Sequence, residues 1–216
     1  MKAGGTRYPV FIPEECRTVK ELLIQGSYQA AIDRLEHDAR LGSMSAGALL
    51  GYLYLQGAVS GLADLSLAEE LCLPAARRGY PYAQFVMGWV ECSRERYGAG
   101  SEWLGKAAER AFLPALADNA RLMAAGLGFK GPPDSRAALG MLWLAIRRGY
   151  LPFAPYAVAI FRMKSATFKV RIACLLLITV GVPLFAYSLL FENYSERGFF
   201  HYRSPAMQVF RRPEGA

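Results

Sequence analysis

Between residues 46 and 150 the apolar side chains of this chain recur every three or four positions, in runs separated by short polar turns. That spacing places the apolar side chains on one stripe of an α-helix. No segment alternates apolar and polar residues over the length of a strand. The pattern therefore predicts an all-α chain without a sheet.

The predicted helices form pairs that repeat along the chain. Ala46, Ala83 and Ala115 each open a first helix, and a glycine or alanine follows five positions later. A second helix completes each unit and ends at a small residue. Aligning these small residues gives spacings of 37, 32 and 38 residues, at Gly42, Gly79, Ala111 and Gly149. Periods of this size indicate stacked supersecondary units.

Glycines explain how the two helices of a unit come together. Gly51 and Gly88 lack a side chain, so a partner helix can approach closely at these positions. Gly57 and Gly126 fall where the first helix must stop and turn, which suits a left-handed backbone. Asp64, Ser101 and Asp134 precede the second helices, and we expect them to cap those helices.

The first unit carries a recognisable signature. It reads A-x-x-x-L-G-x-x-Y-x-x-G, from Ala46 through Leu50, Gly51 and Tyr54 to Gly57. This pattern resembles the Sel-one-like repeats, a class related to tetratricopeptide repeats. The resemblance covers about residues 46–158, and the later matches to its ending are Asp64, Ala68, Ala75, Ala76, Gly79, Trp103, Lys106, Ala107, Ala108, Trp143 and Gly149.

The resemblance implies an alpha-alpha superhelix, a solenoid of helix hairpins whose concave groove holds a protein or peptide partner. The chain departs from the family pattern in the later units. Glu91 stands in place of an aromatic residue, Arg94 in place of the turn glycine, and Phe153 where an alanine would open a fourth unit. The number of repeats is therefore three to four.

Around the repeats the sequence predicts further segments. Thr18 and Glu21 have the spacing of a capping box at the start of an N-terminal helix pair. The predicted organisation is an N-terminal extension (1–17), capping helices (18–41), repeats (42–158), a basic juxtamembrane connector (159–171), a transmembrane helix (172–191) and a short tail (192–216).

Residues 172–191 form an uncharged run of twenty residues. As an α-helix this run is about 30 Å long, the thickness of the hydrocarbon core of a bilayer. The run predicts a single membrane-spanning helix, and a fully buried helix that caps the domain is the alternative. The cations on its N-terminal side place the large N-terminal part in the cytoplasm and the tail on the opposite side of a bacterial inner membrane: Arg162, Lys164, Lys169 and Arg171.

Composition and charge agree with attachment to lipid. Hydrophobic residues make up 53% of the chain and charged residues 20%. Residues 1–100 carry ten Lys and Arg against eleven Asp and Glu, whereas residues 101–216 carry fifteen against seven. Because the positive excess lies around the apolar run, anionic lipid explains it better than nucleic acid does.

Candidate chemistry is sparse. The four cysteines are scattered without a C-x-x-C pair, and His37 and His201 have no partners at metal-ligand spacing. The G-x-G-x-x-G motif at 126–131 follows a predicted helix rather than a strand, so we interpret it as a turn. Trp89, Trp103 and Trp143 are interpreted as core residues. The sequence predicts no catalytic residues, cofactor, metal or small-molecule substrate.

These observations lead to one favoured function and two alternatives. The favoured function is a membrane-anchored adaptor that binds another protein or a peptide in the repeat groove and assembles or regulates a membrane complex. An immunity-type or inhibitor protein that blocks a single toxin or enzyme would use the same groove. A membrane-bound enzyme is less favoured because catalytic pairs are missing.

Overall fold

The computed structural model describes residues 12–191 apart from residues 26, 60–61, 130, 149–152 and 165, and gives the backbone alone for residues 14, 24, 155 and 184–191. Every regular element in this part of the chain is a helix. A 3-10 turn at Glu14–Cys16 precedes ten α-helices: α1 (Arg17–Ile24), α2 (Tyr28–Arg40), α3 (Met44–Leu55), α4 (Leu65–Arg77), α5 (Pro81–Ser93), α6 (Tyr97–Glu109), α7 (Leu113–Ala125), α8 (Ser135–Arg147), α9 (Ala154–Phe161) and α10 (Phe168–Phe191).

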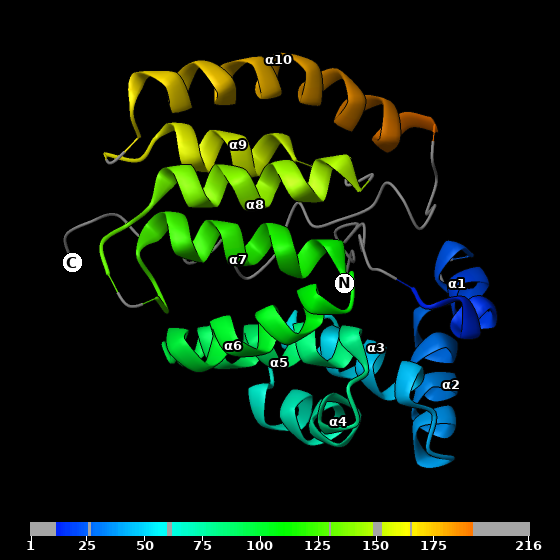
Figure 1. The fold of residues 1–216 in the computed structure, drawn as a ribbon. Coiled ribbons are helices and arrows are strands. Elements are labelled where there is room, and N and C mark those ends of the chain that lie inside the picture. Colours follow the sequence, from blue (N-terminus) through cyan, green and yellow to red (C-terminus); the bar gives the residue numbers. More distant parts are fainter. Residues whose placement is uncertain are drawn as a thin grey trace.

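The helices pack as successive antiparallel pairs in one continuous stack (Figure 1). α1 and α2 lie at one end, α10 lies at the other, and each helix packs on the next in the chain. The first helices also contact one another, α3 with α5 and α7 with α9. The prediction of an all-α solenoid of helix hairpins is confirmed.

The two helices of a pair are buried to different extents. The first helices α3, α5 and α7 are buried along most of their length, as in α5, where all side chains from Tyr82 to Cys92 are buried. The second helices bury a single stripe, which in α4 consists of Ala68, Cys72, Ala75 and Ala76. The first helices therefore form an inner layer and the second helices an outer one.

The turns largely follow the predicted glycines. Gly57, Gly79 and Gly126 adopt left-handed backbones with φ of 68°, 87° and 69°. Two turns use other residues, because Glu95 and Ala111 adopt φ of 63° and 61°. Gly149, the predicted end of the third unit, lies outside the described residues.

The predicted helix caps were partly wrong. Asp64 and Asp134 accept hydrogen bonds from the first backbone amides of α4 and α8, as expected. Ser101, however, lies inside α6, because the three-residue turn after α5 lets α6 begin at Tyr97. The Ser101 hydroxyl instead donates a hydrogen bond of 2.9 Å to Asn119 Oδ1 in α7. Thr18 also lies inside its helix, which begins one residue earlier and has no side-chain cap.

An ion-pair network accounts for the departures of the second unit from the repeat signature. Glu91 is buried at the end of α5 and pairs with Arg96 at 2.6 Å. Arg94 lies in the turn and pairs with Glu69 in α4 and with Glu91 at 3.9 Å. These side chains connect α4 to the α5–α6 turn, where the first unit has Tyr54 and Gly57.

The structure places the predicted membrane helix differently from the sequence-based prediction. α10 begins at Phe168, four residues before the predicted start, so the connector is shorter than 159–171. α10 packs along α9 as the second helix of a fourth pair rather than standing apart from the repeats (Figure 1). Among the residues described, no helix is long and apolar enough to cross a membrane. The side chains of residues 184–191 and the predicted tail 192–216 lie outside the described part.

We predict that Gly51 is required for the close packing of α3 on α4. A Cβ added there would lie 3.1 Å from Ala68 O and would collide with Cys72 Sγ, so Gly51→Ala should lower the unfolding free energy by about 2 kcal/mol. Gly140 is the matched control, since it lies in a helix with nothing within 4 Å of such a Cβ. Gly140→Ala should raise stability by about 0.5–1 kcal/mol. Urea unfolding of both variants measures the two effects, and a stable Gly51→Ala protein would contradict the prediction.

Candidate functional site

The repeat-signature residues have packing roles. The alanines that open the first helices, together with Leu50, Gly51 and Gly88, are buried between helices. Tyr54, Trp103 and Gly126 are half-buried. Lys106 Nζ lies 4.4 Å from the ring centroid of Trp103, a cation–π contact on the outer layer.

Trp143 is an exception to the prediction that all three tryptophans are core residues. Its side chain is 50% exposed on α8, whereas Trp89 is buried. The reason is geometric: α8 buries a single stripe formed by Ser135, Ala138, Leu142 and Ala145. Trp143 follows Leu142 directly and lies beside that stripe rather than on it.

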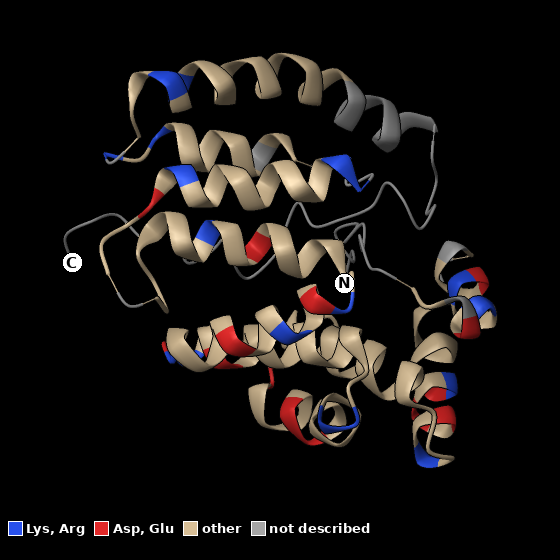
Figure 2. Cartoon of the chain, in the orientation of Figure 1, with Lys and Arg blue, Asp and Glu red and all other residues tan. Residues whose placement is uncertain are grey.

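The four predicted flanking cations lie together at one end of the last helix pair. Arg162 follows the last residue of α9, Lys169 and Arg171 lie in the first turn of α10, and Lys164 lies between the two helices. All four side chains are exposed. In Figure 2 blue segments lie at the shared end of α9 and α10. Beyond Arg171 the sequence of α10 contains no charged residue.

A buried polar cluster joins three inner helices. Trp89 Nε1 of α5 donates a hydrogen bond of 2.9 Å to Asp118 Oδ2 of α7. Asp118 and Arg121, one turn apart on α7, are fully or nearly fully buried. Tyr156 of α9 reaches the same carboxyl group. We call Trp89, Asp118, Arg121 and Tyr156 the inner polar cluster.

Burial dominates the electrostatics of this cluster. It raises the pKa of Asp118 from 3.8 to about 6, because removal from water disfavours the charged carboxylate. The positive charge of Arg121 and hydrogen bonds from Tyr156 and Trp89 act in the opposite direction and lower the pKa. The effect of burial on the pKa is larger than theirs. The folded protein therefore keeps an ionisable carboxyl group out of water at a cost in free energy.

An aromatic cluster extends from the inner polar cluster toward the N-terminal repeats. The ring centroids of Tyr52 and Tyr82 lie 6.1 Å apart, and those of Phe85 and Phe112 lie 5.2 Å apart. Tyr82 is 5.8 Å from Phe112 and joins the two pairs. Burial raises the pKa of Tyr52 and of Tyr82 well above 10, so both phenols stay neutral and can serve as hydrogen-bond donors.

Candidate metal ligands are not grouped in the described part of the chain, and its cysteines are buried. No group of three or more His, Cys, Asp or Glu residues is placed there to hold a metal ion. Burial raises the pKa of the Cys72 thiol above its ordinary value and that of Cys92 to about 12, so these thiols are protonated at neutral pH. Asp118 has neighbours that donate hydrogen bonds but no described nucleophile to activate.

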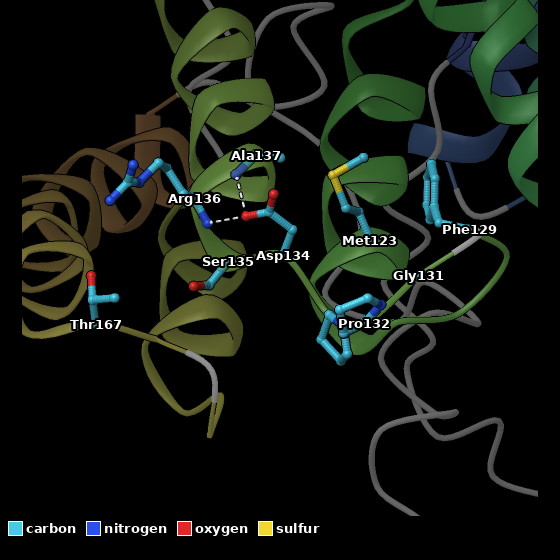
Figure 3. A pocket seen from close by; sticks show the side chains of 10 residues that line it. Met123, Phe129, Gly131, Pro132, Asp134, Ser135, Arg136, Ala137 and Thr167 are labelled. Carbon is cyan, nitrogen blue, oxygen red and sulfur yellow. Dashed lines mark hydrogen bonds between the residues drawn. The ribbon is translucent and has the colours of Figure 1, made fainter.

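A separate cavity of about 610 Å³ is lined by the start of α8, the turn that precedes it, Met123 of α7 and Thr167 (Figure 3). Asp134 Oδ1 there accepts 2.9 Å hydrogen bonds from the backbone amides of Arg136 and Ala137. Because Asp134 occupies these donors, the start of α8 is not available to bind an anion. The predicted turn at 126–131 contributes Phe129 and Gly131 to the cavity wall.

Sequence reasoning missed Asp118 and Arg121. Both lie in α7, the first helix of the third repeat, but no motif singles them out. One signal was available: α7 is otherwise apolar or uncharged, and these two opposite charges are three residues apart on one face. Charged residues in a helix that is buried all round are costly and indicate a specific role.

The architecture defines an α-solenoid of stacked helix hairpins. Within that class it is similar to the crystal structure of a Sel1 repeat protein from Oxalobacter formigenes, with a TM-score of 0.58 and 21% identity over 90% of this chain and 80% of that one. A protective antigen of uropathogenic Escherichia coli with an SLR fold has a TM-score of 0.47 and 19% identity, covering 73% of this chain and 40% of its own. No family model and no curated protein sequence matches the chain. The first structure shows the Sel1-repeat fold.

Asp118 predicts a pH dependence of stability. The unfolded carboxyl group titrates near 3.8 and the folded one near 6, so the folded protein retains a proton that the unfolded chain releases between these values. The stabilisation that this proton provides is complete below 3.8 and is lost as the pH rises through about 6. The loss should be on the order of 2 to 3 kcal/mol.

Asp118→Asn removes this titration while keeping an acceptor for Trp89. Urea unfolding of both proteins from pH 4 to pH 7.5 gives the difference between their unfolding free energies. The contributions of the titrating groups that both proteins share cancel in this difference. The wild type should lose stability relative to the variant across this range. A difference that stays constant with pH would contradict the assignment.

Proposed function

We propose that this protein is a scaffold for protein–protein interaction that is held at a membrane, and that its inner helices form the partner-binding face. The observation that carries the proposal is the inner polar cluster, which is built into the inner layer of a Sel1-type solenoid at an energetic cost. The proposal assigns the protein no catalytic step.

The position of the cluster within the repeat supports this proposal. Counted from the opening alanine, Asp118 lies at offset three, where the earlier units have Leu49 and Val86. Arg121 lies at offset six, where they have Tyr52 and Trp89. The fold tolerates apolar or aromatic residues at both offsets, so the charges of the third unit are not required for packing. Burying charged groups costs free energy, which favours recognition as the role of Asp118 and Arg121.

Helix geometry indicates which way these offsets face. Gly51 and Gly88, at offset five, contact the second helix of their own unit through residues such as Cys72 and Leu104. At roughly 100° per residue, offset three lies about 160° from offset five, on the opposite side of the helix, and offset six lies about 100° from it. Asp118 therefore points away from the second helix of its own unit, and Arg121 and the aromatic rings at offset six lie to one side of it.

Trp89, Asp118 and Arg121 are 1%, 0% and 2% exposed, so they do not contact a partner themselves. In this proposal the inner polar cluster instead fixes the positions of the inner helices that face the partner. Pre-organisation of this kind lowers the cost of binding.

The membrane part of the proposal rests on the C-terminal helix pair. α10 is uncharged beyond Arg171, and four exposed cations lie at its N-terminal end. Cations of this kind favour the cytoplasmic face, where the leaflet is anionic. We therefore propose that the solenoid lies on the cytoplasmic side of a bacterial inner membrane. There it assembles or regulates a membrane complex, at an effective concentration raised by confinement.

Affinity capture from detergent-solubilised membranes tests the binding face. Full-length wild type should retain a specific protein partner, and Asp118→Asn should retain at least about tenfold less of it, equivalent to a loss of roughly 1.4 kcal/mol. Glu102→Gln is the matched control, since Glu102 is exposed on the outer helix α6. Circular dichroism at the capture pH checks that all three proteins are equally folded.

Two results would contradict the proposal. If no protein is retained by wild type above the level of an unrelated helical-repeat bait, the scaffold function fails. If a partner is retained equally by Asp118→Asn and by wild type, the inner polar cluster does not contribute to partner binding.

A further inference from the structure

We infer that α10 lies along the surface of an anionic membrane while it remains packed on α9, with its outward face in the lipid. This inference rests on the membrane attachment proposed above and specifies its geometry. It differs from the spanning helix predicted from the sequence, in which residues 172–191 cross the bilayer.

The inward face of α10 is closely packed on the solenoid. Val170, Cys174 and Gly181 are buried. A Cβ added to Gly181 would lie 2.5 Å from Phe153 Cε2 and 3.1 Å from Ala154 Cβ, so the backbone of α10 approaches α9 very closely at this point. The contact extends over three turns of α10, from Val170 to Gly181.

The outward face of α10 is apolar and exposed. Leu176 is 63% and Val180 58% exposed, and Thr179 between them satisfies its hydroxyl by donating to Leu176 O. A helix that is apolar all round normally lies in a protein core or a membrane. Here α9 covers one side only, and the other side has these exposed apolar residues: Phe168, Ile172, Leu175, Leu176, Val180 and Val182.

Packing on α9 and spanning the bilayer exclude each other for the first half of the predicted span. A spanning helix would take Cys174 and Gly181 away from α9 and into lipid. Phe153, Tyr156 and Ile160, which are buried in the same hydrophobic cluster, would then lose their cover. A helix that lies in the membrane plane keeps these contacts and also removes the exposed face from water.

Charge identifies the partner surface as anionic. Residues 135–191 contain seven Lys and Arg residues and no Asp or Glu. Arg162, Lys164, Lys169 and Arg171 lie together at one end of the apolar face (Figure 2). An apolar helix face bordered by exposed cations matches the acyl chains and anionic headgroups of a lipid surface.

Flotation of the full-length protein with vesicles tests the surface. Wild type should float with phosphatidylglycerol-containing vesicles, less so at high salt, and poorly with pure phosphatidylcholine. Leu176→Glu should reduce the bound fraction at least fivefold. Leu41→Glu is the control, since Leu41 is 75% exposed beyond the end of α2 and should leave binding unchanged. Lys169→Glu combined with Arg171→Glu should weaken binding to anionic vesicles specifically.

The depth of labels in the bilayer distinguishes the two geometries. Single cysteines at Ile172, Leu176 and Val180 can carry a fluorophore that is quenched by lipids with nitroxides at different depths. If α10 lies in the plane, all three labels should be equally shallow. If it spans, the labels at 172 and 180 should differ in depth by roughly 12 Å, eight residues along the helix.

Each outcome has a defined meaning. Equal shallow depths together with the Leu176→Glu defect support the inference. Flotation with graded depths overturns the in-plane geometry but leaves the membrane attachment standing. If wild type does not float at all, both the in-plane geometry and the membrane attachment are wrong. A dimer in sedimentation that Leu176→Glu abolishes, without flotation, would instead assign the face to a second copy of the chain.

Discussion

The close approach of paired helices at a small residue is the contact on which the stack depends, and at three points that residue is glycine. Gly51 and Gly88 lie at the same offset in successive first helices, and at each the second helix leaves no room for a side chain. A similar close approach occurs in the last pair, where the glycine, Gly181, lies on the second helix, α10, and the first helix, α9, approaches it. Because each pair packs on the next, the spacing set inside one unit is carried along the solenoid.

Much of the fold could be predicted from the sequence because the repeat signature marks backbone requirements. Gly57, Gly79 and Gly126 were predicted at turns and have positive φ, since few other residues adopt that conformation without strain. Ser101 was misjudged as a cap for a reason that no local pattern contains. Its role depends on Asn119, eighteen residues further along the chain.

The candidate site was much less predictable than the fold. Asp118 and Arg121 are ordinary residues for a helix surface, and only the burial of α7 on all sides makes them unusual. Burial of this kind is a tertiary property, so periodicity cannot reveal it. The apolar run at 172–191 shows the same limit. Its composition indicates a helix that avoids water, but whether α9 or lipid covers a given face depends on packing.

The ion pairs at the α5–α6 turn have a consequence for how repeats persist. In this unit Arg94 and Glu91 connect neighbouring helices where the first unit uses a glycine turn and an aromatic ring, and the hairpin geometry is retained. A hairpin can therefore lose its defining residues one at a time while electrostatic contacts maintain its shape. A repeat that diverges in this way becomes hard to recognise in the sequence while its two helices still pack as a hairpin.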